Sequence, residues 1–208
     1  GGDTAAQYPE RVAAALWYQM LGDDAYETRI WQRLDEPDLL WKLITSGAHC
    51  IPTSSMGRLF DGFASALELC HHNTFEGEAA MILENESIGG SGEPYPIDVG
   101  ASGAIDLVPM IRAVDLDLGA DVSRTTIAYR FHQTIIELIV KGAQRLGNER
   151  VLLTGGCFQN TVLLSGAIQK LRESGFAPYW HNYIPCNDEG LSAGQVLVAA
   201  RMSLGSFG

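Results

Sequence analysis

The sequence lacks the features that would mark a zinc module or a membrane protein. Its cysteines, Cys50, Cys70, Cys157 and Cys186, form no CxxC pair and no spacing typical of a zinc module. No apolar run approaches the ~20 residues that cross a bilayer, and no charged segment followed by an apolar stretch opens the chain. We therefore expect reduced cysteines, no membrane association and a cytoplasmic location.

Positive charge is also scarce. Fourteen Lys and Arg residues stand against 25 Asp and Glu residues, a net charge of −11. Proteins that follow a nucleic-acid backbone or an anionic membrane need clustered Lys and Arg, so both partners are disfavoured. Any anionic ligand would have to be held by local backbone donors.

The residues that are present predict a folded chain. With 46% hydrophobic residues and 208 residues in all, the chain can bury a core and has the size of one large domain or two small lobes. It begins with Gly1-Gly2-Asp3 and no initiator Met, so we expect it to be part of a longer protein.

Hydrophobic periodicity predicts an α/β fold. Before residue 50 the pattern is helical, and the α/β part covers 51–208. Alternating strands and helices near the C-terminus imply a parallel or mixed sheet with packed helices. The expected elements are helices over 9–34 (broken near residue 22), 37–44, 59–70, 76–83 and 123–146, a hairpin or edge pair at 95–99 and 104–108, strands at 151–153 and 177–181, and helices at 160–173 and 190–202.

The stretch LLTGGCFQN, residues 152–160, is a strand that passes through Gly155 and Gly156 into a helix beginning at Asn160. A helix start after such a turn favours a phosphate, because free N–H groups and the helix dipole meet there. A structural turn without a ligand explains the pattern as well, since it matches neither GxGxxG nor the Walker motif. Cys157 is a candidate nucleophile at the helix start, or a small residue under the turn with no identified base.

The stretch PCNDEGLSAGQ, residues 185–195, is a second turn that enters a helix. Asn187 or Asp188 could be an ordinary N-cap. Alternatively, Asp188 points into the same cleft as Gly155 and Gly156, because both turns leave strands at their C-terminal ends. A carboxylate near phosphates generally needs a cation between them, which would make Asp188 one metal ligand.

The stretch TSSMGRLFD, residues 53–61, begins another helix. Asp61 could pair with Arg58 at i, i+3, or it could accept hydrogen bonds from the hydroxyls of a ribose. The neighbouring His71 and His72 suggest a metal site, but adjacent residues point in different directions on a helix and are more often solvated.

Five motifs in this order, GGDTAAQYPERVAAA, TSSMGRLFD, FEGEAA, TGGCFQN and NDEGLSAGQ, closely resemble the C-terminal carbamoyltransferase region of HypF, the maturation factor of [NiFe] hydrogenases. The resemblance implies a lobe of an actin-like ATPase (ASKHA-type) fold. It also implies that Gly155, Gly156 and Asn160 lie against a nucleotide and that Asp61 contacts the ribose. Gly77 would lie near the nucleoside, and Asp188 would bind a metal.

The resemblance further implies an activity. HypF-like proteins use ATP and carbamoyl phosphate to form carbamoyl-adenylate and pass the carbamoyl group to the C-terminal cysteine of HypE. A divalent metal (Fe, Zn or Mg) would be shared with residues upstream of Gly1, so the sequence identifies no catalytic residue in this chain. Two alternatives remain open: a lobe of an O-carbamoyltransferase or of a tRNA threonylcarbamoyl transferase relative, and a non-catalytic docking module.

Overall fold

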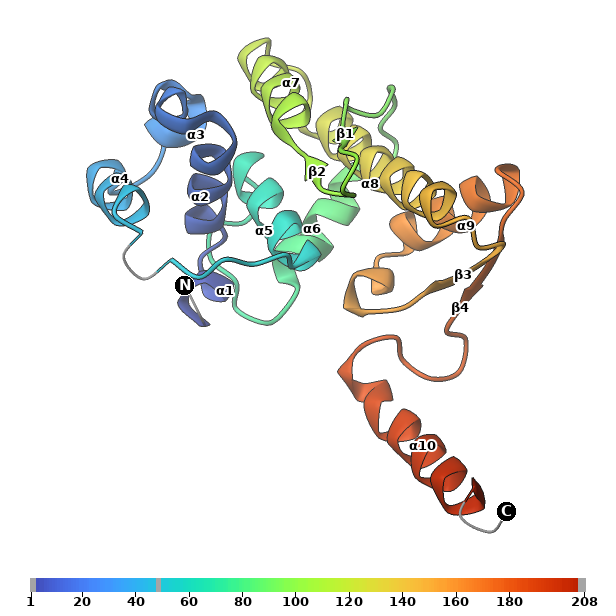
Figure 1. The fold of residues 1–208 in the computed structure, drawn as a ribbon. Coiled ribbons are helices and arrows are strands. Elements are labelled where there is room, and N and C mark those ends of the chain that lie inside the picture. The colour runs from blue at the N-terminus through green and yellow to red at the C-terminus, as the bar shows by residue number, and fades with distance from the viewer. Residues whose placement is uncertain (1–2, 48–49, 206–208) are drawn as a thin grey trace. The chain divides into compact units, whose positions relative to one another are not determined.

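The computed structural model describes residues 3–47 and 50–205 and divides into two compact units (Figure 1). The first is Gly1–Leu138 and the second Ile139–Gly208, with the boundary inside helix α8 (Arg124–Leu146). Gly1 and Gly2 of the opening motif lie outside the described residues. The predicted division into 1–50 and 51–208 differs from these units, because helices from both sides of residue 50 belong to the first.

The first unit begins with the predicted helical block. Pro9 occupies the first turn of α2, where its missing N–H costs nothing, and Gly22 ends the helix at φ +61° with its N–H bonded to the Tyr18 carbonyl oxygen. The break expected near Gly22 is therefore confirmed. The helices of this block are α1 (Asp3–Gln7), α2 (Pro9–Leu21), a 3₁₀ turn η1 (Gly22–Glu27), α3 (Arg29–Gln32) and α4 (Pro37–Thr45).

Helix α5 (Met56–Ala66) provides much of the core of the first unit. The Ser55 hydroxyl accepts the Arg58 N–H and caps the helix. On its buried face, the ring of Phe63 stacks on that of Phe131 at a centroid distance of 4.1 Å and packs against Trp17 of α2 at 5.8 Å. Burial of each such side chain contributes roughly 1.5–3 kcal/mol, which explains why α2 and α5 form one core.

The rest of the first unit adds two more helices and a short hairpin. Helix α6 (Glu78–Ser87) matches the expected helix over 76–83, and β1 (Asp98–Val99) pairs antiparallel with β2 (Ile105–Asp106), which confirms the hairpin. Helix α7 (Val108–Gly119) is not predicted by the sequence pattern. Its buried side chains, Met110, Ile111 and Val114, have helical spacing, but the alternating Asp and Leu residues at 115–118 obscure that period.

The second unit contains the predicted strand and helix alternation. Strand β3 (Arg150–Leu153) leads through the 3₁₀ turn η2 (Gly156–Gln159) into α9 (Thr161–Glu173), which returns to β4 (Ala177–Trp180). The two strands are parallel, in a register that pairs Leu153 with Trp180. A second 3₁₀ turn, η3 (Asp188–Gly190), then leads into α10 (Leu191–Gly205). Each observed sheet is two-stranded, one antiparallel and one parallel.

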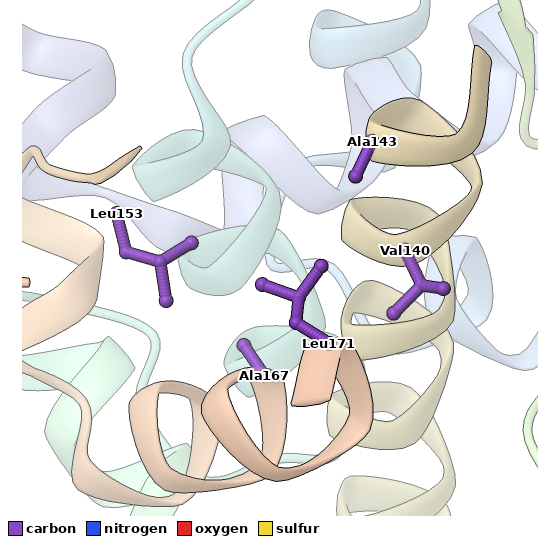
Figure 2. Packing of buried hydrophobic residues seen from close by; sticks show 5 residues of the cluster. All are labelled: Val140, Ala143, Leu153, Ala167 and Leu171. Carbon is purple, nitrogen blue, oxygen red and sulfur yellow. The ribbon is translucent and has the colours of Figure 1, made fainter. Parts of the chain in front are cut away.

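One apolar cluster forms the core of this second unit and includes the end of α8. Figure 2 shows its buried side chains, which come from α8 (Val140 and Ala143), β3 (Leu153) and α9 (Ala167 and Leu171). The crossover helix α9 thus covers one face of the parallel pair, as expected for a strand–helix–strand unit. Leu153, the last residue of β3, packs in this cluster, so the strand end that leads into the glycine turn is fixed against α9.

Candidate functional site

The turn after β3 has a backbone conformation that favours glycine. Gly155 has φ +107°, a region that L side chains rarely adopt. Its N–H donates to the carbonyl oxygen of Cys186 at 2.9 Å, which ties the turn to the loop after β4. This particular N–H is therefore already bonded within the protein, and a phosphate would have to use other donors.

Asn160 ends the turn and begins the next helix. It is the N-cap of α9: its Oδ1 accepts the Leu163 N–H at 2.8 Å, and its side chain is buried. It does not line the cavity described next. The nucleotide contact of Asn160 stays a prediction. Its side-chain Oδ1 has a structural role as a helix cap, which the sequence pattern did not reveal.

A cavity of about 690 Å³ lies at the C-terminal edge of the parallel strands. Gly155, Gly156 and Asp188 all line it, so the structure brings together three of the residues predicted from two separate motifs. Its wall comes from the turn after β3, the loop after β4, η3 and one side of α10. A position beyond the carboxyl ends of parallel strands is where open α/β sheets bind ligands.

The wall includes residues that sequence reasoning did not single out. Thr154 and His181 each follow directly after a strand, and the Thr154 Oγ1 lies 2.9 Å from the His181 Nε2. Gly190 also lines the cavity, and a Cβ there would lie 2.2 Å from the carbonyl oxygen of Pro185. The signal that could have revealed Thr154 and His181 is their shared position at the strand ends.

Asp188 is exposed at the start of η3, where Asn187 holds the N-cap position without a side-chain capping bond. The Asn187 Oδ1 is enclosed and has no hydrogen-bond partner in the described part of the chain. In residues 3–47 and 50–205, no group of three or more His, Cys, Asp and Glu side chains is placed to hold a metal ion. Asp188 alone could supply one ligand, which is too few for a transition-metal site.

Asp61 and Gly77 belong to the first unit, whereas the cavity belongs to the second. The Asp61 carboxylate is buried with Oδ2 only 2.8 Å from the Arg58 Nη1, so the alternative i, i+3 ion pair is present, though not on the surface. Burial raises the pKa of Asp61, and the Arg58 charge opposes that rise. Gly77 is the left-handed N-cap residue of α6 at φ +83°. Their predicted nucleoside contacts stay predictions.

The two adjacent histidines of the first unit make separate contacts. His71 Nδ1 lies 2.9 Å from the Ser65 Oγ, and the His72 ring packs edge-on against Tyr8 with centroids 5.0 Å apart. Neither belongs to a metal-holding group in the described residues. Cys157 takes part in no disulfide and its side chain is partly exposed, so its role as a candidate nucleophile stays a prediction.

A parallel strand pair that ends in a glycine turn beside a cavity defines the class of this second unit as an α/β lobe. Residues 1–195 match the family model described as carbamoyltransferase, Kae1-like domain, second subdomain. The chain therefore belongs to the HypF carbamoyltransferase family, and the resemblance drawn from its motifs is confirmed.

Individual HypF proteins are similar to the chain over most of its length. The chain is 37% identical to carbamoyltransferase HypF of Synechocystis sp. over 95% of its own length and 28% of the relative's. It is 37% identical to HypF of Rhodobacter capsulatus over 78% of its length and 22% of the relative's. It thus spans about a quarter of the length of these proteins.

Solved structures support the predicted fold. A crystal structure of full-length HypF in the phosphate- and nucleotide-bound form superposes with a TM-score of 0.85 at 31% identity, covering 97% of this chain and 27% of that one. HypF of T. kodakarensis superposes with a TM-score of 0.80 at 23% identity, covering 95% and 28%, which shows the fold alone. In the described residues, no helix has both the length and the apolar character to cross a membrane.

Proposed function

We propose that this chain is the nucleotide-binding part of a HypF-type enzyme that transfers a carbamoyl group from carbamoyl-adenylate to the C-terminal cysteine of a HypE-like acceptor. The observation that carries the proposal is the shared cavity of Gly155, Gly156 and Asp188 at the strand ends. Family membership and a nucleotide-bound relative support it. The role of the whole enzyme would be to supply the cyanide ligands of [NiFe] hydrogenases, with ATP and carbamoyl phosphate as substrates.

The proposed reaction sets clear demands on the site. The acceptor thiolate attacks the carbamoyl carbon, a C–S bond forms, and the bond from that carbon to the AMP phosphate oxygen breaks. AMP leaves with the electron pair, so negative charge grows on its phosphate. Donors held in fixed positions stabilise that charge and orient the adenylate. The glycine turn allows a phosphate to approach the backbone closely, since neither Gly155 nor Gly156 places a side chain in the cavity.

The exposed Asp188 would contribute one oxygen ligand to a divalent cation, and the remaining ligands would come from elsewhere in the full-length protein. Such a cation offsets the repulsion between the Asp188 carboxylate and the phosphates. In the described residues, no group of three or more His, Cys, Asp and Glu side chains is placed to hold such a cation. Asp188 therefore acts in the proposal as a ligand that positions the cation relative to the glycine turn.

A pair of neighbouring substitutions tests the proposal in the full-length protein. Asp188→Asn should weaken binding of AMP in the presence of Mg²⁺, measured by isothermal titration calorimetry, by about tenfold or more. Glu189→Gln is the matched control: it removes the same charge one residue away, at a position that does not line the cavity. Equal losses in both variants would indicate a general charge effect. If wild-type protein binds no nucleotide at millimolar concentration but captures a protein partner, the docking-module alternative holds instead.

A further inference from the structure

The Thr154 and His181 side chains form a cross-strand pair at the edge of the cavity. Leu153 and Trp180 are the last residues in register between β3 and β4, and Thr154 and His181 follow them directly. Thr154 Oγ1 lies 2.9 Å from His181 Nε2, and both residues line the cavity beside Gly155. Both side chains are exposed, so this hydrogen bond forms at the cavity surface and not in the core.

The turn does not depend on this hydrogen bond. It is already tied to the loop after β4 by the bond from Gly155 N–H to the Cys186 carbonyl oxygen at 2.9 Å. The Leu153 side chain beneath it packs in the apolar cluster with Ala167 and Leu171. Loss of the Thr154–His181 bond should therefore leave the fold of the second unit in place.

The chemistry of the pair depends on which atom donates. A neutral imidazole has one N–H and one acceptor nitrogen. When Nε2 carries the hydrogen, it donates to Thr154 Oγ1, and the Thr154 hydroxyl hydrogen is left to donate to a bound group. An anion accepts hydrogen bonds only, so an anionic ligand selects this arrangement. The Gly155 N–H is bonded to Cys186, which makes a side-chain donor at this turn more valuable.

We propose that Thr154 is a ligand-binding residue whose hydroxyl donates to a phosphate oxygen of the nucleotide, and that His181 is its positioning residue, donating through Nε2–H to Thr154 Oγ1. This assignment rests on the nucleotide function proposed above. The proposal thus places two side chains at the phosphates in addition to the backbone of the glycine turn, and these two side chains act as one unit.

Conservative and non-conservative variants of the full-length protein test the assignment, with AMP as the probe in calorimetry. Thr154→Val removes the hydroxyl at similar size, and His181→Phe keeps a ring without a donor. Each should weaken AMP binding by about tenfold, as expected for loss of a hydrogen bond to a charged group. The double variant should be no weaker than either single variant, because the two side chains form one donor chain.

Variants that keep the hydrogen-bond donors distinguish a ligand-binding role of Thr154 and His181 from a structural one. Thr154→Ser keeps the hydroxyl and His181→Gln keeps an amide N–H near the Nε2 position, so both should retain AMP affinity within about threefold, while the melting temperature of all variants stays within about 2 °C of wild type. Additive losses, or unchanged AMP affinity in Thr154→Val, would overturn the assignment. Failure of wild-type protein to bind AMP would instead overturn the proposed nucleotide function and this assignment with it.

Discussion

Single residues of this chain combine structural and candidate ligand roles, and Asn160 shows why the two must be separated. It caps α9 through Oδ1, and it is also a residue for which family resemblance implies a nucleotide contact. Asp61 is similar, because its buried carboxylate is paired with Arg58. An alanine substitution at either position would remove both roles at once.

We predict that Asn160→Ala destabilises the full-length protein by about 1 kcal/mol, because the Leu163 N–H loses its acceptor. Asn160→Ser should restore most of that stability, since a serine hydroxyl also caps helices. Thermal unfolding monitored by circular dichroism measures the stability, and calorimetry with AMP measures binding. A serine variant that is stable but binds AMP tenfold more weakly would establish a ligand contact for the Asn160 amide, whereas full binding would leave only the cap.

His132 is the titratable residue most deeply enclosed in the aromatic core of the first unit. Its ring lies in edge contact with Phe60 and Phe131, and its Nδ1 lies 2.8 Å from the Ala128 carbonyl oxygen. Burial lowers the pKa of His132 below its usual value of 6.5. In the unfolded chain the ring takes up its proton near pH 6.5, whereas in the folded chain it does so only at lower pH.

It follows that the His132 contribution to stability is present above about pH 6.5 and is lost as the pH falls below that value. We predict that wild-type protein loses stability between pH 7.5 and about pH 5 and that His132→Phe, which cannot take up a proton, shows a flatter profile. Urea unfolding across this range is the measurement. Identical slopes for the two proteins would show that other groups dominate the acid dependence.

At the scale of elements, the helices differ in how firmly they are attached. Helix α4 has no buried residue, and its Trp41 ring meets those of Tyr18, Tyr26 and Trp31 at centroid distances of 5.2, 5.0 and 5.2 Å. The Tyr26 hydroxyl also donates to Asp38 Oδ1 at 2.5 Å. Trp41 is thus the aromatic side chain of this helix that contacts three rings outside it.

We predict that Trp41→Ala releases α4 at a local cost of about 2 kcal/mol while leaving the core of α2 and α5 folded. Hydrogen exchange followed by mass spectrometry should show loss of protection over 37–45 alone. Leu39→Ala is the control in the same helix, because Leu39 is 48% exposed and should change little. Loss of protection throughout α2 and α5 would show that α4 is an integral part of the core.

At the scale of the whole molecule, the residues predicted to contact a nucleotide are distributed over both units. The cavity lies in the second unit, and Asp61 and Gly77 lie in the first. The metal assigned to Asp188 would need ligands that the described residues do not group together. The chain also spans only about a quarter of the length of its relatives.

We predict that the 208 residues alone retain less than one divalent metal ion per chain after dialysis and that the full-length protein retains more. Asp188→Ala should then lower the metal content of the full-length protein, while Glu189→Ala should not. Elemental analysis by inductively coupled plasma mass spectrometry decides this. One tightly bound ion per 208-residue chain that survives Asp188→Ala would contradict the assignment and point to another cluster.

Local sequence signals determined much of the secondary structure and the family of this protein. Pro9 and Gly22 bound a helix, Gly155 sits at a positive φ that favours glycine, and the ordered motifs identify a HypF-type carbamoyltransferase lobe. These signals act through backbone conformation and short-range periodicity, which a sequence displays directly. Helix α7 escaped prediction because its period is obscured by alternating Asp and Leu residues.

Only the tertiary structure decided which side chains meet. Thr154 and His181 are far apart in sequence and become neighbours only through the parallel register of β3 and β4. Tertiary packing also engaged the Gly155 N–H with Cys186 and buried the Asp61–Arg58 pair that the i, i+3 spacing allowed, so that groups predicted to face a ligand already have protein partners. Register and burial depend on contacts between distant segments, and for that reason no local pattern in the sequence could specify them.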